Sequence, residues 1–454
     1  MDKELQRVLL ESPENVAELL RSVAHPVRIR ILASLLKGEN DFSKLMQTTA
    51  LSKTALANHL TQLINSRLIE RVARGEYKLT SDGRDLLSSA VSMYRNSARR
   101  EEQKSELLLR RYTEGLSEGK TLSKKVISKK VEYMPCWLSY TGAMAGALRG
   151  LGVNCDTADV GGYSGYSFII NVAKGTTCPS GPTALPGETW KEIHKGTESL
   201  AYALEWGGHH GSYPAEPGKP TPEELEIVKK LFEKIKREID ERDQPVVLWG
   251  LVVPEYGIVK GYEGNAYVVS TFRSLAKQPE EPVLFYNLDS PGAIDAFFFR
   301  EKIKGNSKAT DKEALERAIR FASGKTPIHQ NYVGGPASCE EWADVLETLP
   351  EPKQSYMGNS YVGACVCESR NMCAQFLRRL AQKHPGEASE HLQKAAECYE
   401  KELELMKRFT VLFPFKHQGE MKTENRKKGA DILKKVTPLE ELAVKHMRNA
   451  SKEL

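Results

Sequence analysis

The chain has 454 residues, of which 40% are hydrophobic and 28% are charged. This length exceeds what one hydrophobic core usually organises, and the composition is that of a folded protein rather than a disordered one, so we expect two or three domains. No apolar run approaches the ~18 residues needed to cross a bilayer, and the eight cysteines do not suggest a disulfide framework. We therefore expect a cytoplasmic protein with reduced thiols and no membrane partner.

Charge is distributed unevenly along the chain. Residues 1–130 contain 24 Lys and Arg against 16 Asp and Glu, whereas the remaining residues contain 41 against 44. A basic excess confined to one part of a chain favours the docking of a polyanion there. We therefore expect double-stranded DNA as the partner of the N-terminal part, and a different task for the rest.

Four segments within the first 65 residues have the apolar periodicity of helices. They are residues 4–22, 25–37, 41–47 and 52–65. The segments 69–73 and 77–80 alternate like strands around Arg74-Gly75-Glu76, which predicts a β-hairpin. Helices followed by a hairpin in this order predict a winged helix-turn-helix domain over residues 1–85.

The helix that Ser52 begins is predicted to have two faces. Leu56, Leu60 and Leu63 form its apolar stripe, so the short polar side chains of the other face point outward, where they suit base edges in a major groove. Lysine and arginine on the helix N-terminus and on the hairpin suit phosphate. The residues that we expect to bind DNA are Lys53, Thr54, Asn58, Thr61 and Asn65 on the helix, and Arg71, Arg74 and Lys78 on the wing.

Two histidines near this helix are predicted to pack rather than to bind. His59 lies beside the apolar stripe, and His25 precedes Pro26 at the start of a helix. A histidine in such a place is usually a hydrogen-bonded core residue. Some winged helices bind proteins instead of DNA, and that alternative stays open at this point.

Residues 22–87 resemble the ArsR-type winged-helix repressors. The resemblance rests on SVAHPVRIRILASLLKGENDFSKLM followed by LSKTALANHLTQLINSRLIERVARGEYKLTSDGRDLL, in which helix, turn and wing keep the spacing of that family. It covers about a seventh of the chain. It implies a winged-helix transcription regulator.

Residues 86–130 are predicted to connect the domains. Residues 83–115 have the pattern of one long helix, whose apolar positions are too sparse for a core of its own. We interpret it as a helix that pairs with its symmetry mate, so that the expected regulator is a homodimer. Residues 117–130 are rich in Lys and Ser and are predicted to be a linker.

The remainder is predicted to be an α+β domain over residues 131–350, followed by a helical region over residues 351–454. Small residues in 136–151 predict a helix that packs closely, and residues 157–190 are predicted to be loop and strand. Residues 221–243 have the caps and periodicity of an amphipathic helix. Strands are predicted at 246–253, 257–262, 266–271 and 283–288, and helices at 311–323, 339–349, 361–382, 387–412 and 427–450.

Residues 131–344 resemble the N-terminal domain of the butirosin-biosynthesis acyltransferases (BtrH), which is itself similar to papain-like cysteine peptidases. The segments that carry the resemblance are PCWLSYTGAMAGALRGLG, VGGYSGYSF, PVVLWGLVVPEYGIVKGYEG, FYNLDSP and GGPASCEEWADVL. It implies a papain-like fold, with Cys136 as nucleophile at a helix N-terminus and Asp289 as the residue that orients the base. Glu255-Tyr256 stands where the family has its histidine, and the oxyanion Gln expected about six residues before Cys136 is missing.

We therefore interpret residues 131–350 as a catalytically degenerate domain that binds a small-molecule effector. All five tryptophans lie in this part, and the glycines of VGGYSGYSF allow a bound molecule to approach closely. The residues expected to contact the effector are Trp137, Tyr140, Tyr163, Tyr166, Phe168 and Tyr256.

Two other functions stay open. An active thiol acyltransferase or peptidase would need the fold to place His329 or His210 beside Cys136, where the imidazole could act as the general base. A cysteine redox sensor would use Cys136 or the three cysteines of residues 365–373, although we favour buried structural thiols there. His209 and His210 are expected in a surface or pocket loop, and neither a metal site nor a cofactor is expected.

Overall fold

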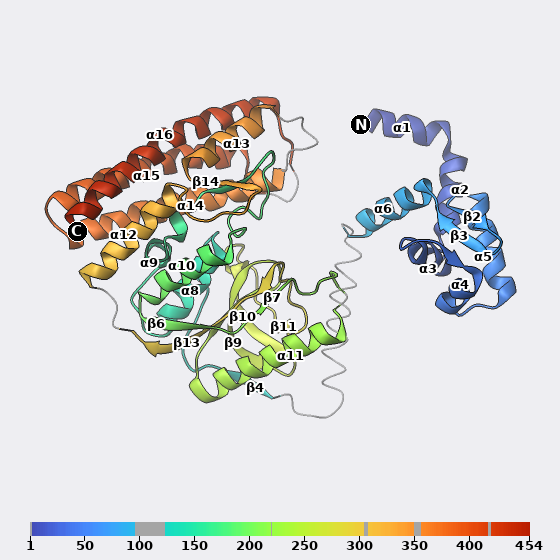
Figure 1. The fold of residues 1–454 in the computed structure, drawn as a ribbon, viewed down its shortest axis with the longest axis horizontal. Coiled ribbons are helices and arrows are strands. Elements are labelled where there is room, and N and C mark those ends of the chain that lie inside the picture. Colours follow the sequence, from blue (N-terminus) through green and yellow to red (C-terminus); the bar gives the residue numbers. More distant parts are fainter. Residues whose placement is uncertain (1, 96–122, 219, 304–306, 349–355, 416–418) are drawn as a thin grey trace. The chain divides into compact units, whose positions relative to one another are not determined.

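The computed structural model describes residues 2–95, 123–218, 220–303, 307–348, 356–415 and 419–454. The chain divides into two compact units, residues 1–121 and residues 122–454 (Figure 1). Each unit has a hydrophobic core of its own. The chain is therefore multidomain, as its length predicts.

The first unit, coloured blue in Figure 1, combines helices with a three-stranded antiparallel sheet. Strand β1 (Asn40–Asp41) pairs with β3 (Glu76–Leu79), which pairs with β2 (Ile69–Ala73). The helices are α1 (Asp2–Glu11), α2 (Pro13–Val23), α3 (Pro26–Leu35), α4 (Phe42–Thr49), α5 (Lys53–Asn65) and α6 (Ser81–Arg95). Helices α3 to α5 followed by the hairpin β2–β3 have the order of a winged helix-turn-helix.

Two predicted helices of this unit differ from the observed ones. Residues 4–22 form two helices instead of one, because Pro13 has no amide hydrogen to donate and begins α2 at its first position. Of the long helix predicted over residues 83–115, the structure describes the part that ends with α6 at Arg95. The rest of that prediction lies outside the described residues.

The second unit is built around an antiparallel sheet with the strand order β11-β10-β9-β8-β13-β6. A further strand, β4, pairs with β9, although the sequence predicts a linker at residues 117–130. The strands of this sheet are β4 (Lys124–Val126), β6 (Tyr202–Trp206), β8 (Val246–Trp249), β9 (Tyr256–Glu263), β10 (Ala266–Ser270), β11 (Val283–Leu284) and β13 (Ala296–Lys302).

Helices cover both faces of this sheet. Neighbouring residues of β13 point to opposite faces, as strand geometry requires. Phe297 contacts Tyr140 of α8 (Ser139–Gly150) and His194 of α10 (Gly187–Glu198). On the other face, the ammonium group of Lys234 of α11 (Pro222–Arg237) lies over the ring of Phe298. Helix α11 continues as the π-helix η2 (Glu238–Arg242). Helix α8 can lie close to its neighbours because a Cβ at Gly146 would stand 2.1 Å from the carbonyl oxygen of Glu132.

Residues 157–190 are predicted to be loop and strand, and β5 (Asn171–Ala173) is such a strand, but their glycine-rich first part is helical. Residues Thr157–Ser164 form α9, which ends at Gly165 with φ +76°, and Tyr166–Phe168 form the short helix η1. Glycine serves packing here, since a Cβ at Gly162 would stand 2.1 Å from Cγ of Phe376. The remaining short elements are β7 (His209–His210), η3 (Phe272–Ser274), β12 (Ala293–Ile294) and β14 (Tyr332–Gly334).

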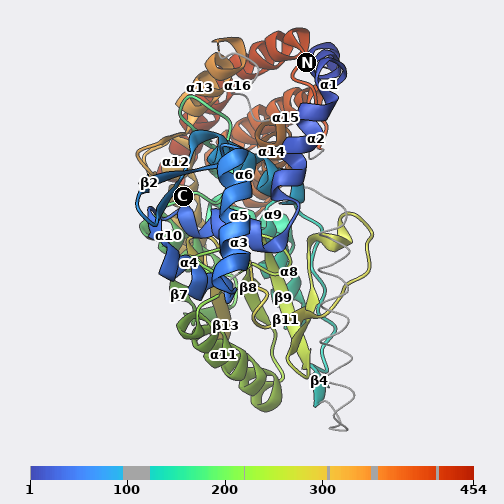
Figure 2. The same ribbon diagram turned by 90° about the vertical axis from the view of Figure 1, so that its right-hand side faces the viewer.

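Long helices complete the second unit (Figure 2). They are α12 (Lys308–Ala322), α13 (Pro336–Thr348), α14 (Tyr356–Lys383), α15 (Glu387–Leu412) and α16 (Thr423–Glu453). Phe376, Tyr399 and Met447 of α14, α15 and α16 share one core cluster with the sheet residues. The helical region of residues 351–454 therefore packs as part of the second unit. Within the described residues, no helix combines the length and the apolar character needed to cross a bilayer.

Candidate functional site

Helix α5 has one buried face and one exposed face. Leu56, Leu60 and Leu63 are at most 2% exposed and lie in the core of the first unit. The hydroxyl of Ser52 accepts a hydrogen bond from the amide of Ala55 and so defines where the helix begins. The side chains predicted to face DNA are all exposed: Lys53, Thr54, Asn58, Thr61 and Asn65.

The hairpin next to this helix carries three exposed cations. Arg71 lies on β2, Lys78 lies on β3, and Arg74 lies in the turn between them. The turn closes through Gly75, whose φ of +87° is easily adopted by glycine alone. The structure therefore brings the predicted wing residues together on one hairpin beside α5.

His25 and His59 contact each other and are both half-buried, so they lie at the edge of the core and not within it as the sequence predicts. Their ring centroids are 4.7 Å apart, and Nδ1 of His25 accepts a hydrogen bond from the amide of Val27 at the start of α3. Burial, followed by the nearby His25 and Arg28, lowers the pKa of His59. A neutral, packed imidazole is the physical consequence.

Residues 17–93 match a regulator family. The matching family model is that of the N-terminal domain of the methanogenesis regulatory protein FilR1. A search of the solved structures found a likeness to the transcriptional repressor BigR from Xylella fastidiosa, with 24% identity, 20% of this chain and 92% of that chain covered, and a TM-score of 0.18. No curated protein matches the chain. The family match spans the winged helix together with most of α2 and α6, and we call residues 17–93 the regulator domain.

In the second unit, Cys136 lies in the turn before α8, where the papain-like resemblance places a nucleophile. The residue is 1% exposed. Burial, the charge of Glu368 and a hydrogen bond with Glu368 raise the pKa of the Cys136 thiol well above its usual range. Such a thiol stays protonated, whereas a catalytic cysteine needs a lowered pKa. The described groups that shift the pKa of Cys136 most are Glu368, the backbone of Leu138 and Cys365, and they include no histidine.

Tyr256, which stands where the papain-like resemblance expects a histidine, is hydrogen-bonded to an aspartate. The hydroxyl of Tyr256 donates to Oδ2 of Asp295 at 3.0 Å, and Nε1 of Trp206 donates to Oδ1 of Asp295 at 2.7 Å. The predicted residue, Asp289, instead lies in the loop before β12, where its amide donates to the carbonyl of Gly250 at 2.9 Å. The carboxylate that faces residue 256 is thus Asp295.

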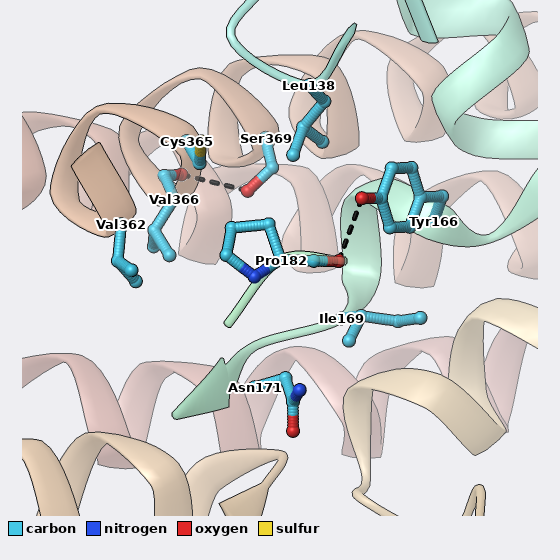
Figure 3. Close-up of a pocket in the computed structure, with 9 residues that line it drawn as sticks. All are labelled: Leu138, Tyr166, Ile169, Asn171, Pro182, Val362, Cys365, Val366 and Ser369. Atoms are coloured by element: carbon cyan, nitrogen blue, oxygen red, sulfur yellow. Dashed lines mark hydrogen bonds between the residues drawn. The ribbon is translucent and has the colours of Figure 1, made fainter. Parts of the chain in front are cut away.

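Most residues predicted to contact an effector are packed in the core. Tyr140, Tyr166, Phe168 and Tyr256 are at most 2% exposed, and the ring of Tyr140 packs edge-on against those of Tyr166 and Tyr256. Tyr166 also lines a cavity of about 10 Å³, together with Cys365 and Ser369 of α14 (Figure 3). This cavity has room for one water molecule, so an effector could enter only after rearrangement.

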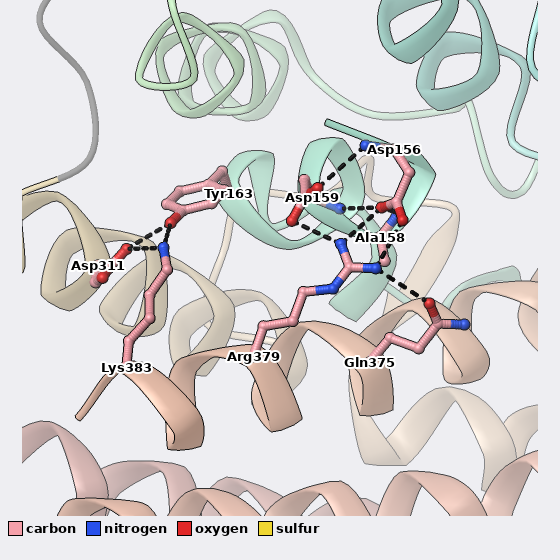
Figure 4. A network of polar contacts seen from close by, with 8 residues as sticks. All are labelled: Asp156, Ala158, Asp159, Tyr163, Asp311, Gln375, Arg379 and Lys383. Atoms are coloured by element: carbon pink, nitrogen blue, oxygen red, sulfur yellow. Dashed lines mark hydrogen bonds and ion pairs between the residues drawn. The ribbon is translucent and has the colours of Figure 1, made fainter. Parts of the chain in front are cut away.

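The two other predicted effector residues lie at the junction with the helical region. Half-buried Trp137 packs against Phe415, with ring centroids 4.7 Å apart. Tyr163 donates to Oδ1 of Asp311 at 2.5 Å and accepts a hydrogen bond from Lys383 at 2.8 Å (Figure 4). Arg379 of α14 pairs next to this network with Asp156 and Asp159, the two acidic residues of the capping box of α9. Tyr163 therefore contributes to the connection between helices.

Of the cysteines and histidines named for the rival functions, Cys365 is the one among the groups that shift the pKa of Cys136 most. Cys365 and Cys373 are buried in α14, and Cys367 is half-buried. His209 and His210 form the exposed strand β7, and the ring of His329 lies beside Tyr332. The described residues contain no group of three or more His, Cys, Asp or Glu side chains that could hold a metal ion.

Sequence reasoning missed three carboxylates that surround the Cys136 region. Glu368 accepts a hydrogen bond from the backbone of the turn before α8. Glu255 accepts a hydrogen bond from Tyr361 at 2.5 Å, and Asp295 accepts one from Tyr256. Asp295 could have been found as an acidic residue just before an apolar strand. Glu368 gives no such signal, because it is one glutamate in a long helix that lies 232 positions along the chain from Cys136.

Proposed function

We propose that this protein is a homodimeric transcription regulator that binds double-stranded DNA through its regulator domain. The observation that carries the proposal is the exposed polar face of α5, opposite the buried leucine stripe and beside a hairpin with three cations. A helix with this division inserts its polar face into a major groove, while the wing contacts the sugar–phosphate backbone. The family match of residues 17–93 supports the same function.

Within this proposal, each polar residue has a definite task. Asn58 lies in the first half of α5 and has the amide group that pairs with adenine in two hydrogen bonds. Lys53 at the helix N-terminus and Arg74 at the wing tip have side chains that suit phosphate. Asn58 would therefore determine sequence preference, and Arg74 would contribute affinity for any duplex.

A homodimer is supported by apolar side chains on the surface of the first unit. A second copy of the chain would remove these side chains from water, and a C₂ dimer is the commonest arrangement of two copies. A second copy would also place two α5 helices on two half-sites of one duplex. The residues on α1, α2 and α6 are Leu9, Leu10, Leu19, Leu20, Val91, Met93 and Tyr94.

For the second unit, we propose a catalytically degenerate, papain-like domain that senses a small-molecule effector. The position of α8 against β9 and the Tyr256–Asp295 pair support the resemblance. The protonated Cys136, whose surroundings in the described chain are dominated by carboxylates, supports the loss of catalysis. An effector would bind where Trp137, Tyr166 and the cavity beside α14 meet, after that region opens.

The DNA-binding proposal predicts different effects for Arg74 and Asn58. After selection of a preferred duplex from a random library, Asn58→Ala should weaken binding to it by about 1–3 kcal/mol and leave a scrambled duplex unaffected, because Asn58 binds base edges alone. Arg74→Ala should weaken binding to both duplexes alike. It should also make the slope of log K against log salt shallower by about 1 for each phosphate that is no longer neutralised. Fluorescence anisotropy measures both.

Lys401→Ala is the matched control, because it removes an exposed cation from α15 in the second unit. It should leave the affinities for both duplexes unchanged. Equally weakened binding in all three variants would contradict the proposed interface, and so would an Asn58→Ala protein with unchanged sequence preference.

A further inference from the structure

Three hydrogen-bond donors converge on one carboxylate of α14. The amide of Trp137 donates to Oε2 of Glu368, and the thiol of Cys136 and the amide of Leu138 lie near enough to the same carboxyl group to lower its pKa against the effect of burial. These donors belong to consecutive residues of the turn that leads into α8. Glu368 therefore occupies the position where backbone amides beside a nucleophilic thiol would otherwise be free to stabilise an anion.

The same helix makes two further contacts near Cys136. The thiol of Cys365, one turn before Glu368, donates to the carbonyl of Trp137 at 3.6 Å. The hydroxyl of Tyr361, another turn earlier, donates to Glu255 at 2.5 Å. Residues spaced by three or four positions share one face of a helix, so a single face of α14 makes all of these contacts.

We propose that Glu368 holds the Cys136 thiol unreactive: it lies beside the thiol and accepts a hydrogen bond from the neighbouring amide of Trp137, so this thiol becomes reactive toward electrophiles only when α14 releases the turn before α8. The inference does not depend on DNA binding, because all of its contacts lie within the second unit. It also explains why a cysteine in a nucleophile position carries no thiolate in this conformation.

Electrostatics of the groups around Cys136 agree with this geometry. After burial, Glu368 is the largest cause of the raised pKa of the Cys136 thiol, through its charge and its hydrogen bond. Burial also raises the pKa values of Glu255 and Glu368. The charged groups that act most strongly on the thiol are acidic, so a second negative charge on sulfur is opposed while Glu368 is present.

Alkylation of the full chain with iodoacetamide tests the proposal, since the thiolate sulfur displaces iodide and each cysteine peptide can be followed by mass spectrometry. Glutamine has nearly the shape of glutamate but no charge. We therefore expect iodoacetamide to alkylate Cys136 at least about tenfold faster in Glu368→Gln than in the wild type at pH 8. Glu368→Ala should in addition speed hydrogen exchange at the amides of Trp137 and Leu138. Buried Cys339 and Cys373, whose pKa values Glu368 does not shift, should keep their wild-type rates.

Glu397→Gln removes an exposed carboxylate from α15 and is the matched control, for which the labelling rates of Cys136, Cys339 and Cys373 should stay unchanged. An unchanged Cys136 rate in a folded Glu368→Gln protein would overturn the proposal. Equal acceleration at Cys136, Cys339 and Cys373 would overturn it too, because Glu368 would then only stabilise the unit as a whole. Retained DNA binding in these variants separates this result from the proposed function.

Discussion

Arg370→Met should lower the free energy of unfolding of the second unit by about 3–5 kcal/mol, because it leaves the buried carboxylate of Glu440 without its cation. Arg370 of α14 and Glu402 of α15 are fully buried, and Glu440 of α16 is 1% exposed. The guanidinium pairs directly with Glu440, lies 3.5 Å from Glu402 and donates to the carbonyl of Ser167 at 2.9 Å. One side chain thus connects three helices with the segment that contains Tyr166.

Arg378→Met provides the matched control, because Arg378 lies on the same helix and pairs with Glu400 at the surface, where the two side chains are 37% and 47% exposed. A pair in water contributes at most about 1 kcal/mol. Urea unfolding followed by tryptophan fluorescence reports on the second unit, which contains every tryptophan. Equal destabilisation of the two variants would contradict the role given to Arg370.

Glu402→Gln should remove a decline in stability that the wild-type protein shows as the pH rises. Burial raises the pKa of Glu402 to about 8, from an ordinary value of 4.5. The folded protein therefore holds this proton more tightly than the unfolded chain does. The resulting stability is fully present below pH 4.5 and is lost by about 1.4 kcal/mol per pH unit up to pH 8, above which it stays constant.

The difference between Glu402→Gln and wild type isolates this group from Glu255 and Glu368, whose pKa values shift in the same direction. Near pH 4.5 the two proteins should be almost equally stable, and by pH 8 the Gln variant should be the more stable one by several kcal/mol. Urea unfolding at five pH values measures this, with exposed Glu400→Gln as the control. Parallel curves for wild type and Glu402→Gln would contradict the prediction.

The winged helix could be predicted from the sequence because its signals are local. Ser52 and Asp41 act as caps, the leucines of α5 recur at helical spacing, and Arg74-Gly75-Glu76 marks the turn of the hairpin. Each of these features lies within a few residues of the structure that it specifies. The same locality explains why the exposed face of α5 could be predicted residue by residue.

The surroundings of Cys136 could not be predicted in the same way, because contacts between distant segments determine them. Glu368 reaches the thiol from a helix far along the chain, and no spacing rule connects the two residues. Glycine at position 162 predicts a loop, but in the structure Gly162 lies in helix α9 and allows that helix to approach Phe376 closely. The papain-like resemblance implies Asp289, whereas the carboxylate that the structure places beside Tyr256 is Asp295.

Binding of the full chain to duplex DNA as a function of salt concentration tests the central claim most directly. Each neutralised phosphate contributes about −0.9 to the slope of log K against log salt. Lys53, Arg71, Arg74 and Lys78 on both subunits of a dimer would give a slope of at most about −7, and we predict a value between about −3 and −7. No duplex binding at low salt, or binding with a slope near zero, would contradict the account.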